Sequence, residues 1–197
     1  MKARILVWTV LATLGLGSSV LADTFAVDPA HTSVQFQVRH MFTKVTGRFQ
    51  MFEGKIVYDE KNPAKTEVQG SIDAASINTN VEKRDNHLRS PDFFDVEKFP
   101  KITFQSTGVS DLDASGKKGK MAGTLTLHGV SRPVVLEASF LGKEKGPDGK
   151  ERAGFYGTTT INRKDFGLTW NKALESGGVL LGDEVTIDLD VEGVQEG

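Results

Sequence analysis

Cysteine is absent from this 197-residue chain, and tryptophan and tyrosine occur only twice each. Without cysteine the chain forms no disulfide, so it must fold on its hydrophobic core alone. Hydrophobic residues make up 38% of the sequence and charged residues 25%, which is typical of a globular domain rather than a disordered segment. The length is sufficient for one ordinary domain that needs no covalent support.

A basic excess is also lacking, since 24 Lys and Arg residues are matched by 26 Asp and Glu residues. No global positive field is available to hold a nucleic-acid backbone, so we expect no nucleic-acid partner. The chain has no Walker loop, no Gly-x-Ser-x-Gly elbow and no His-Glu-x-x-His sequence. Its four histidines lack zinc-ligand spacing, and no carboxylate pair suits acid–base work. We therefore expect no metal, no cofactor and no catalytic residue.

A long hydrophobic run occurs only at the N-terminus, where Ile5 to Leu16 follow Lys2 and Arg4. A membrane-spanning helix needs about 20 apolar residues, so this shorter run predicts a secretory signal peptide rather than an anchor. We expect cleavage after Ala22 and one mature domain over residues 23–197. The mature product should be soluble, without stable membrane insertion.

Strict alternation dominates the rest of the chain. From Val34 to His40 the even positions are apolar and the odd ones polar, which predicts a strand with one buried face. Thr46 to Tyr58 adds a strand that we expect to bend at Gly54. About eight antiparallel strands that must hide their edges predict an all-β barrel with room for one ligand or a filled core. The other alternating segments are 67–72, 101–106, 121–127, 134–140, 155–161 and 185–191.

The segment 80–100 interrupts this pattern. Residues 82–89 lack β-branched side chains and fit a short polar helix, with Asn80 as its N-cap. A polar surface loop does not need three phenylalanines, so we expect this helical insertion to cover one end of the barrel as a lid or plug. The three are Phe93, Phe94 and Phe99.

Several polar residues have two interpretations. His40 shares the inward parity of its strand, so it either reaches solvent or a backbone carbonyl, or meets a ligand head group in an apolar cavity. Arg84, His87 and Arg89 form either an anion site, since guanidinium groups match phosphate, or a solvated helix face neutralised by nearby carboxylates.

The segment 163–167 fits a one-turn helix that ends at glycine. One interpretation is a barrel corner that Arg163 closes with an aspartate, for which Asp165 is available. The other is a ligand contact. Trp170 follows, and either caps the core or lies at the mouth of the cavity.

Four motifs of the chain, taken together, resemble the YceI-like family. They follow one another in the family's order and cover nearly all of residues 23–197. The first runs from Asp28 to His40 with Gly47-Arg48-Phe49, the second spans 87–95 with Phe99-Pro100 and Phe104-x-Ser106, and the later ones are 123–130 and 163–167.

The resemblance implies a lipocalin-like antiparallel barrel exported to the bacterial periplasm. Its elongated cavity would hold a long polyisoprenoid or a similar amphipathic lipid, a quinone included. Motif position and strand parity then give the expected ligand-binding residues. These are Phe36, Val38, His40, His87, Arg89, Phe93, Phe94, Phe104, Leu125, Leu136, Ile161 and Trp170.

Three functions are compatible with these observations. The first is a non-catalytic carrier that transports, stores or delivers its lipid. The second is an enzyme in which His40 or His87 assists chemistry on a lipid or quinone. The third is a stress-related interaction protein whose lipid is structural. The sequence leaves the oligomeric state open, a homodimer included.

Overall fold

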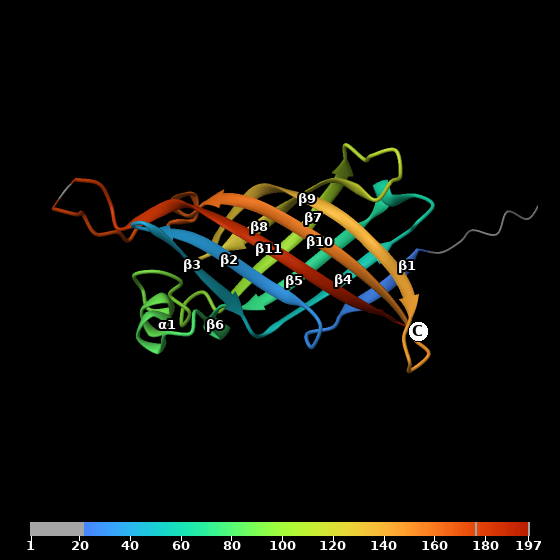
Figure 1. The fold of residues 1–197 in the computed structure, drawn as a ribbon, viewed down its shortest axis with the longest axis horizontal. Coiled ribbons are helices and arrows are strands. Elements are labelled where there is room, and N and C mark those ends of the chain that lie inside the picture. Colours follow the sequence, from blue (N-terminus) through green and yellow to red (C-terminus); the bar gives the residue numbers. More distant parts are fainter. Residues whose placement is uncertain (1–21, 176, 197) are drawn as a thin grey trace, which may run out of the picture.

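The protein is built on one closed antiparallel sheet, seen in a computed structural model that describes residues 22–175 and 177–196. Among the described residues, eleven strands join this sheet, and eight of them form the closed circuit (Figure 1). The predicted all-β barrel with a short helical insertion is confirmed. Residues 1–21 of the expected signal peptide lie outside the described residues. The circuit consists of β1 (Asp23–Val27), β4 (Phe52–Tyr58), β5 (Glu67–Asp73), β7 (Lys101–Ser110), β8 (Lys118–Leu127), β9 (Val130–Lys145), β10 (Glu151–Asn162) and β11 (Leu181–Gln195).

Three further strands extend the sheet beyond the closed circuit. β2 (Ser33–His40) follows β1 along the same edge of β11, β3 (Thr43–Phe49) pairs with β2, and β6 (Ile77–Asn78) pairs with β3.

The predicted bend at Gly54 is wrong, because the interruption lies at Gln50 and Met51, between β3 and β4. There the Gln50 amide donates to the Ser76 carbonyl at 3.2 Å, and the Asp73 amide donates to the Met51 carbonyl at 2.9 Å. The 3₁₀ turn η2 (Ala74–Ser76) therefore breaks the neighbouring strand at the same level.

Side chains hold the ladder together where β1 gives way to β2. The Asp28 carboxylate accepts from the Ala30 amide at 2.9 Å and bonds His31 Nδ1 at 2.8 Å. The Thr32 hydroxyl accepts from the Glu192 amide at 3.1 Å, so β11 stays paired across the gap. The bond between Asp28 and His31 lowers the pKa of the carboxyl and raises that of the imidazole from their ordinary values.

The helix α1 (Glu82–Arg89) has the bounds that the sequence predicts. Its cap differs, because Val81 occupies the N-cap position and Asn80 adopts a left-handed φ of 61° in the turn before it. The buried Asp85 carboxylate instead accepts from the Thr79 amide at 2.8 Å and from the Thr79 hydroxyl at 2.5 Å. None of the described helices is long and apolar enough to cross a membrane.

Two 3₁₀ helices complete the described elements. η1 (Pro63–Lys65) lies before β5, and η3 (Arg163–Phe166) follows β10 and ends at Gly167 with a left-handed φ of 80°. The predicted one-turn helix that ends at glycine is therefore confirmed.

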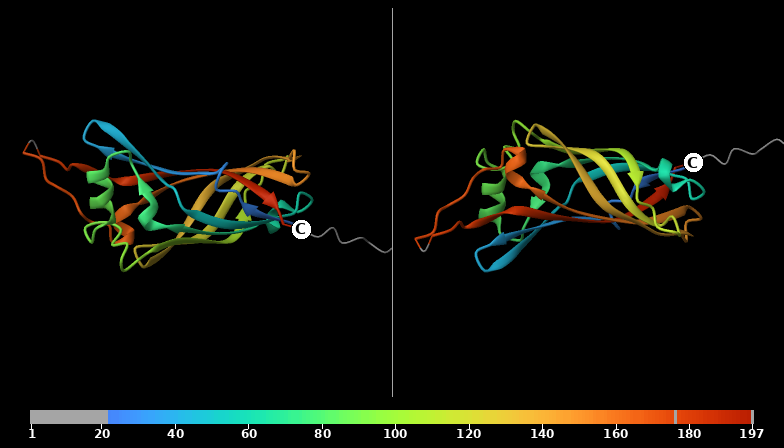
Figure 2. Two further views of the ribbon diagram at one scale, coloured as in Figure 1. Left: turned by 90° about the horizontal axis from the view of Figure 1, so that it is seen from below. Right: turned by 90° about the horizontal axis from the view of Figure 1, so that it is seen from above.

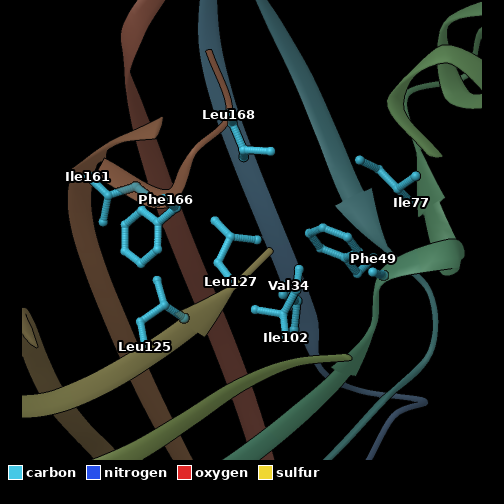
Figure 3. Close-up of a cluster of buried hydrophobic side chains, with 10 residues drawn as sticks. Val34, Phe49, Ile77, Ile102, Leu125, Leu127, Ile161, Phe166 and Leu168 are labelled. Carbon is cyan, nitrogen blue, oxygen red and sulfur yellow. The ribbon is translucent and has the colours of Figure 1, made fainter. Parts of the chain in front are cut away.

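Two clusters of buried side chains occupy the barrel. The larger one gathers residues from β2, β3, β6, β7, β8, β10, η2 and η3, and Figure 3 shows them converging from opposite walls. The second cluster lies at the end where β1 and the C-terminus meet. Its rings pack closely, with centroids 4.5 Å apart for Tyr58 and Phe140 and 5.6 Å from each to Phe155. Its buried members are Phe25, Ile56, Tyr58, Phe140 and Ala153.

The bond between Asp28 and His31 predicts a measurable titration. His31 should titrate above the ordinary value of about 6.5, and Asp28→Asn should bring it back toward that value. A pKa raised on folding stabilises the protein below the unfolded value, and this contribution is lost as the pH rises through the folded pKa. Since His31 is largely exposed, the effect on unfolding should be small.

An NMR titration of the histidine ring measures this pKa. Asp113→Asn is the matched control, because it removes the same charge from an exposed loop that does not contact His31. Equal His31 titration curves in the wild type and in Asp28→Asn would contradict the assignment.

Candidate ligand-binding cavity

A cavity of about 620 Å³ lies inside the barrel. Its volume falls within the range of about 300–1,000 Å³ that is usual for sites binding small organic molecules. Inward-facing apolar positions of the strands form its wall, so the alternation in the sequence correctly assigned the two faces of the sheet. The wall includes Val34, Phe36, Val38, Phe52, Ile56, Val68, Ile72, Ile102, Phe104, Leu125, Val134, Leu136, Ile161, Val185, Ile187, Leu189 and Val191.

The aromatic cluster around Tyr58 and Phe140 forms the floor of this cavity. Ile56, Val68 and Val191 line the cavity and also pack in or against that cluster. Because these rings fill the barrel at that end, the cavity has its mouth at the other end, which α1 covers (Figure 2). Sequence reasoning missed the floor. The inward parity of Phe140 and Phe155 is visible in the sequence, but their meeting with Tyr58 depends on barrel closure.

Glycines keep the lumen wide beside the largest side chains. A Cβ at Gly47 would lie 2.3 Å from the Phe36 ring, and one at Gly123 would lie 2.3 Å from the Phe104 ring. The two rings therefore lie flat against bare backbone instead of crossing the cavity. At Gly70 a Cβ would meet nothing closer than 3.8 Å, so the lumen is open beside it.

An aromatic clasp, formed by His87, Phe93 and Trp170, closes part of the mouth. Its ring centroids are 5.0 Å apart for His87 and Phe93, 4.9 Å for His87 and Trp170, and 5.1 Å for Phe93 and Trp170. His87 Nε2 bonds the Asp92 carboxylate at 2.8 Å, which fixes the orientation of the ring. The clasp thus joins α1 to the chain that leads into β11.

The buried Arg163 holds Trp170 in position. Its Nη1 donates to the Leu168 carbonyl at 2.5 Å and to the Trp170 carbonyl at 2.8 Å. Burial lowers the pKa of this guanidinium from its ordinary value, and Asp183 opposes that effect from 3.4 Å. An arginine and an aspartate therefore do meet at this barrel corner, but the aspartate is Asp183 rather than Asp165.

The expected ligand-binding residues all line the cavity except Arg89. Arg89 donates from Nε to the Ala75 carbonyl at 2.7 Å and from Nη2 to the Ile77 carbonyl at 2.8 Å, so it attaches α1 to β6. The cavity-lining residues of the expected set are Phe36, Val38, His40, His87, Phe93, Phe94, Phe104, Leu125, Leu136, Ile161 and Trp170.

The considered anion site at α1 is not assembled as a unit. Arg84 lines the cavity, but its Nε donates to the Thr79 hydroxyl at 2.7 Å, and Arg89 is engaged at β6.

Only two of the three phenylalanines of the segment 80–100 belong to the cover over the mouth. Phe94 packs against the core residue Phe49 with centroids 5.8 Å apart, whereas Phe99 contacts His128 at 4.7 Å.

Among the described residues, Asp28, His31 and Glu192 place potential metal-ligand atoms within 4.8 Å of one another. This group lies at the break between β1 and β2. Glu192 already pairs with Arg152 Nε at 3.1 Å, and the largely exposed imidazole already bonds Asp28. The group therefore does not indicate a metal site.

The chain is similar to known proteins along most of its length. A family model described as the YceI-like domain matches residues 25–193. A UPF0312 protein of Pseudomonas paraeruginosa is 38% identical over 195 residues, covering 94% of this chain and 97% of that protein. The crystal structure of the Campylobacter jejuni YCEI protein is 34% identical, with a TM-score of 0.70 over 81% of this chain and 90% of that one. A polyisoprenoid binding domain from Saccharophagus degradans shares the fold at 19% identity, with a TM-score of 0.62 over 89% and 99% of the two chains.

The clasp predicts a fluorescence change, because Trp170 is the sole tryptophan in residues 23–197. Phe93→Ala should shift the emission of Trp170 to longer wavelength, since the indole loses an apolar neighbour to water. The same change should lower the free energy of unfolding by about 3–5 kcal/mol, the usual effect of truncating a buried phenylalanine.

Phe99→Ala is the matched control, because Phe99 packs against His128 rather than Trp170. It should leave the emission maximum in place. Circular dichroism establishes that both variants are folded, and an unshifted emission maximum in folded Phe93→Ala would contradict the clasp.

Proposed function

Because this chain belongs to the YceI-like family, we propose that its barrel binds one long-chain polyisoprenoid or a similar amphipathic lipid, such as a prenylated quinone. The observation that carries the proposal is the apolar cavity of about 620 Å³, which is packed shut at its floor and has its mouth under α1. The polyisoprenoid binding domain that shares this fold supports the same class of ligand.

The energetics of such a cavity favour a long hydrocarbon. Each methylene group removed from water contributes roughly 0.8 kcal/mol, so a chain of several isoprene units gains much by entering an apolar lumen. Ordering a flexible chain opposes part of that gain, and affinity should therefore rise less steeply than carbon count. A ligand of this kind needs no catalytic group in the protein.

The distribution of polar groups supports one orientation of the ligand. The floor is aliphatic and aromatic, whereas the basic side chains that line the cavity, among them His40, Lys83 and Arg84, lie toward the mouth. Uncharged polar side chains and Glu53 line the wall between the two ends. A hydrocarbon tail fits against the floor and a polar head group fits near these side chains. His40 would then meet a head group, as its strand parity suggests.

The carrier role is favoured over the enzymatic one. An enzyme would use His40 or His87 on a lipid or quinone, whereas a carrier needs neither imidazole for chemistry, and the clasp gives the His87 ring a packing role. We propose that the protein transports, stores or delivers its lipid. A role as an interaction protein with a structural lipid predicts no exchange of that lipid between membranes.

We also propose export to the periplasm, on the strength of the charged, apolar and small-residue order of residues 1–22. Intact-mass measurement of protein from its own host should show a chain that begins at Asp23. A mass that includes Met1, found in a membrane fraction, would contradict cleavage.

Gly70→Leu tests ligand binding in the lumen. A side chain at this position enters open space, so it should occupy the volume of about three methylene groups of ligand without disturbing the wall. At about 0.8 kcal/mol each, their displacement should weaken affinity for a fluorescent isoprenoid about 50-fold. Native mass spectrometry should show a matching loss of retained lipid.

Gly108→Leu is the control, because a Cβ at this exposed position on β7 meets nothing within 4 Å and the residue does not line the cavity. It adds the same side chain to the exposed surface and should leave affinity unchanged. Full lipid retention by a folded Gly70→Leu protein would show that the ligand does not occupy the lumen.

A further inference from the structure

An apolar rim, formed by Met41, Phe42 and Val179, projects into solvent beside the mouth of the cavity. Met41 is 42% exposed, Phe42 88% and Val179 53%. Met41 and Phe42 form the turn between β2 and β3, and Val179 precedes β11. Both segments lie at the end of the barrel that α1 covers (Figure 2). The Phe42 ring is therefore almost fully in contact with water, although the barrel contains unfilled apolar space.

The rim continues into the wall of the cavity. The Met41 amide donates to the Leu180 carbonyl at 3.0 Å, which joins the β2–β3 turn to the chain before β11. His40 and Leu181 pair in register beneath the rim. Both of these residues, and Leu180, line the cavity. An apolar surface thus runs from the exposed tip to the lumen.

Basic side chains flank the rim without acidic partners. No Asp or Glu occurs from residue 29 to residue 52. Arg39 and Lys44 are exposed and lie directly opposite each other on β2 and β3. Like charges in this position destabilise a strand pair, and among the described residues neither forms an ion pair that would offset the repulsion. An anion that contacts both would relieve it.

Acidic side chains at this end of the molecule lie on α1, on the segment that follows it and on β11, and none lies on the β2–β3 turn. Asp183 is taken by Lys164 at 2.8 Å and by Arg163, and Glu184 lies beside it on β11. On the segment before β11, the negative charge of Glu175 is balanced by the positive charge of Lys172. The excess charge on the β2–β3 turn is therefore positive.

From this arrangement we infer that the rim docks the barrel, mouth first, onto an anionic phospholipid membrane. Exposed apolar side chains between cations are the pattern of proteins that bind in the headgroup region, where the rings enter the acyl boundary and the cations meet phosphate. A stable protein–protein interface buries more than about 1,000 Å² in total and needs a broad patch. A narrow tip of three side chains is therefore better suited to a membrane than to a protein partner. The purpose of docking, which is transfer of lipid, rests on the proposed function. The docking itself does not require a bound lipid.

Vesicle sedimentation tests the inference. The purified protein should bind vesicles of phosphatidylcholine with one-third phosphatidylglycerol better than vesicles of phosphatidylcholine alone, and salt should weaken binding. Phe42→Ser should weaken it about tenfold or more, the effect of losing one buried aromatic side chain. Lys44→Gln should weaken it about fivefold, the effect of losing one cation near an anionic surface. Leu141→Ser is the matched control, because Leu141 is 63% exposed and packs beside Gly154, away from the mouth.

Each outcome is decisive. Absence of wild-type binding to anionic vesicles, or equal binding by Phe42→Ser and Leu141→Ser, overturns the inference. A dimer in gel filtration that only Phe42→Ser dissociates assigns the rim to a second copy of the chain and also overturns it. Retained lipid, measured by native mass spectrometry, is a separate readout. Vesicle binding by a protein that holds no lipid would leave docking in place and refute the proposed function.

Discussion

Three residue pairs between β1 and β11 close the sheet, and the rest of the structure depends on them. They join Phe25 to Gln195, Ala26 to Val194 and Val27 to Gly193. Closure removes the two long edges of the sheet and fixes which face of every strand is inside. Phe25 couples this seam to the floor, because its ring is fully buried beside Phe155, and a Cβ at Gly193 would lie 2.7 Å from its side chain. A larger residue at Gly193 would therefore disturb both the seam and the floor.

A closed barrel with an unfilled lumen has fewer packing contacts than a barrel with a filled core. Side chains such as Phe36 and Leu189 have wall neighbours on one side and cavity on the other, so they forgo dispersion contacts that a filled core would supply. The backbone ladders of the closed circuit and the two buried clusters stabilise the fold in their place. A ligand that fills the lumen restores those contacts in the folded state only, which couples stability to ligand load.

The sequence predicts local features of this architecture better than its long-range ones. Alternation assigns Val34 to the inside correctly, and the absence of β-branched residues predicts α1 with its correct bounds. Gly54 misleads, because the interruption at Gln50 and Met51 is shared with the neighbouring strand through η2, which only the register reveals. The sequence also does not predict the role of Arg89. The carbonyl groups that it contacts lie on η2 and β6, and the position of these segments depends on closure of the sheet.

The two ends of the barrel differ in how they are closed, and this difference assigns them different roles. The floor is a contiguous group of aromatic rings on β1, β4, β9 and β10, so opening it requires separating strands of the closed circuit. The mouth is covered by α1 and by the clasp, where His87 and Phe93 meet Trp170 from a segment outside the regular strands. Parting those rings breaks no strand pairing. The mouth is therefore the end that can open without loss of strand pairing, and it is also where the cavity wall continues into the exposed rim.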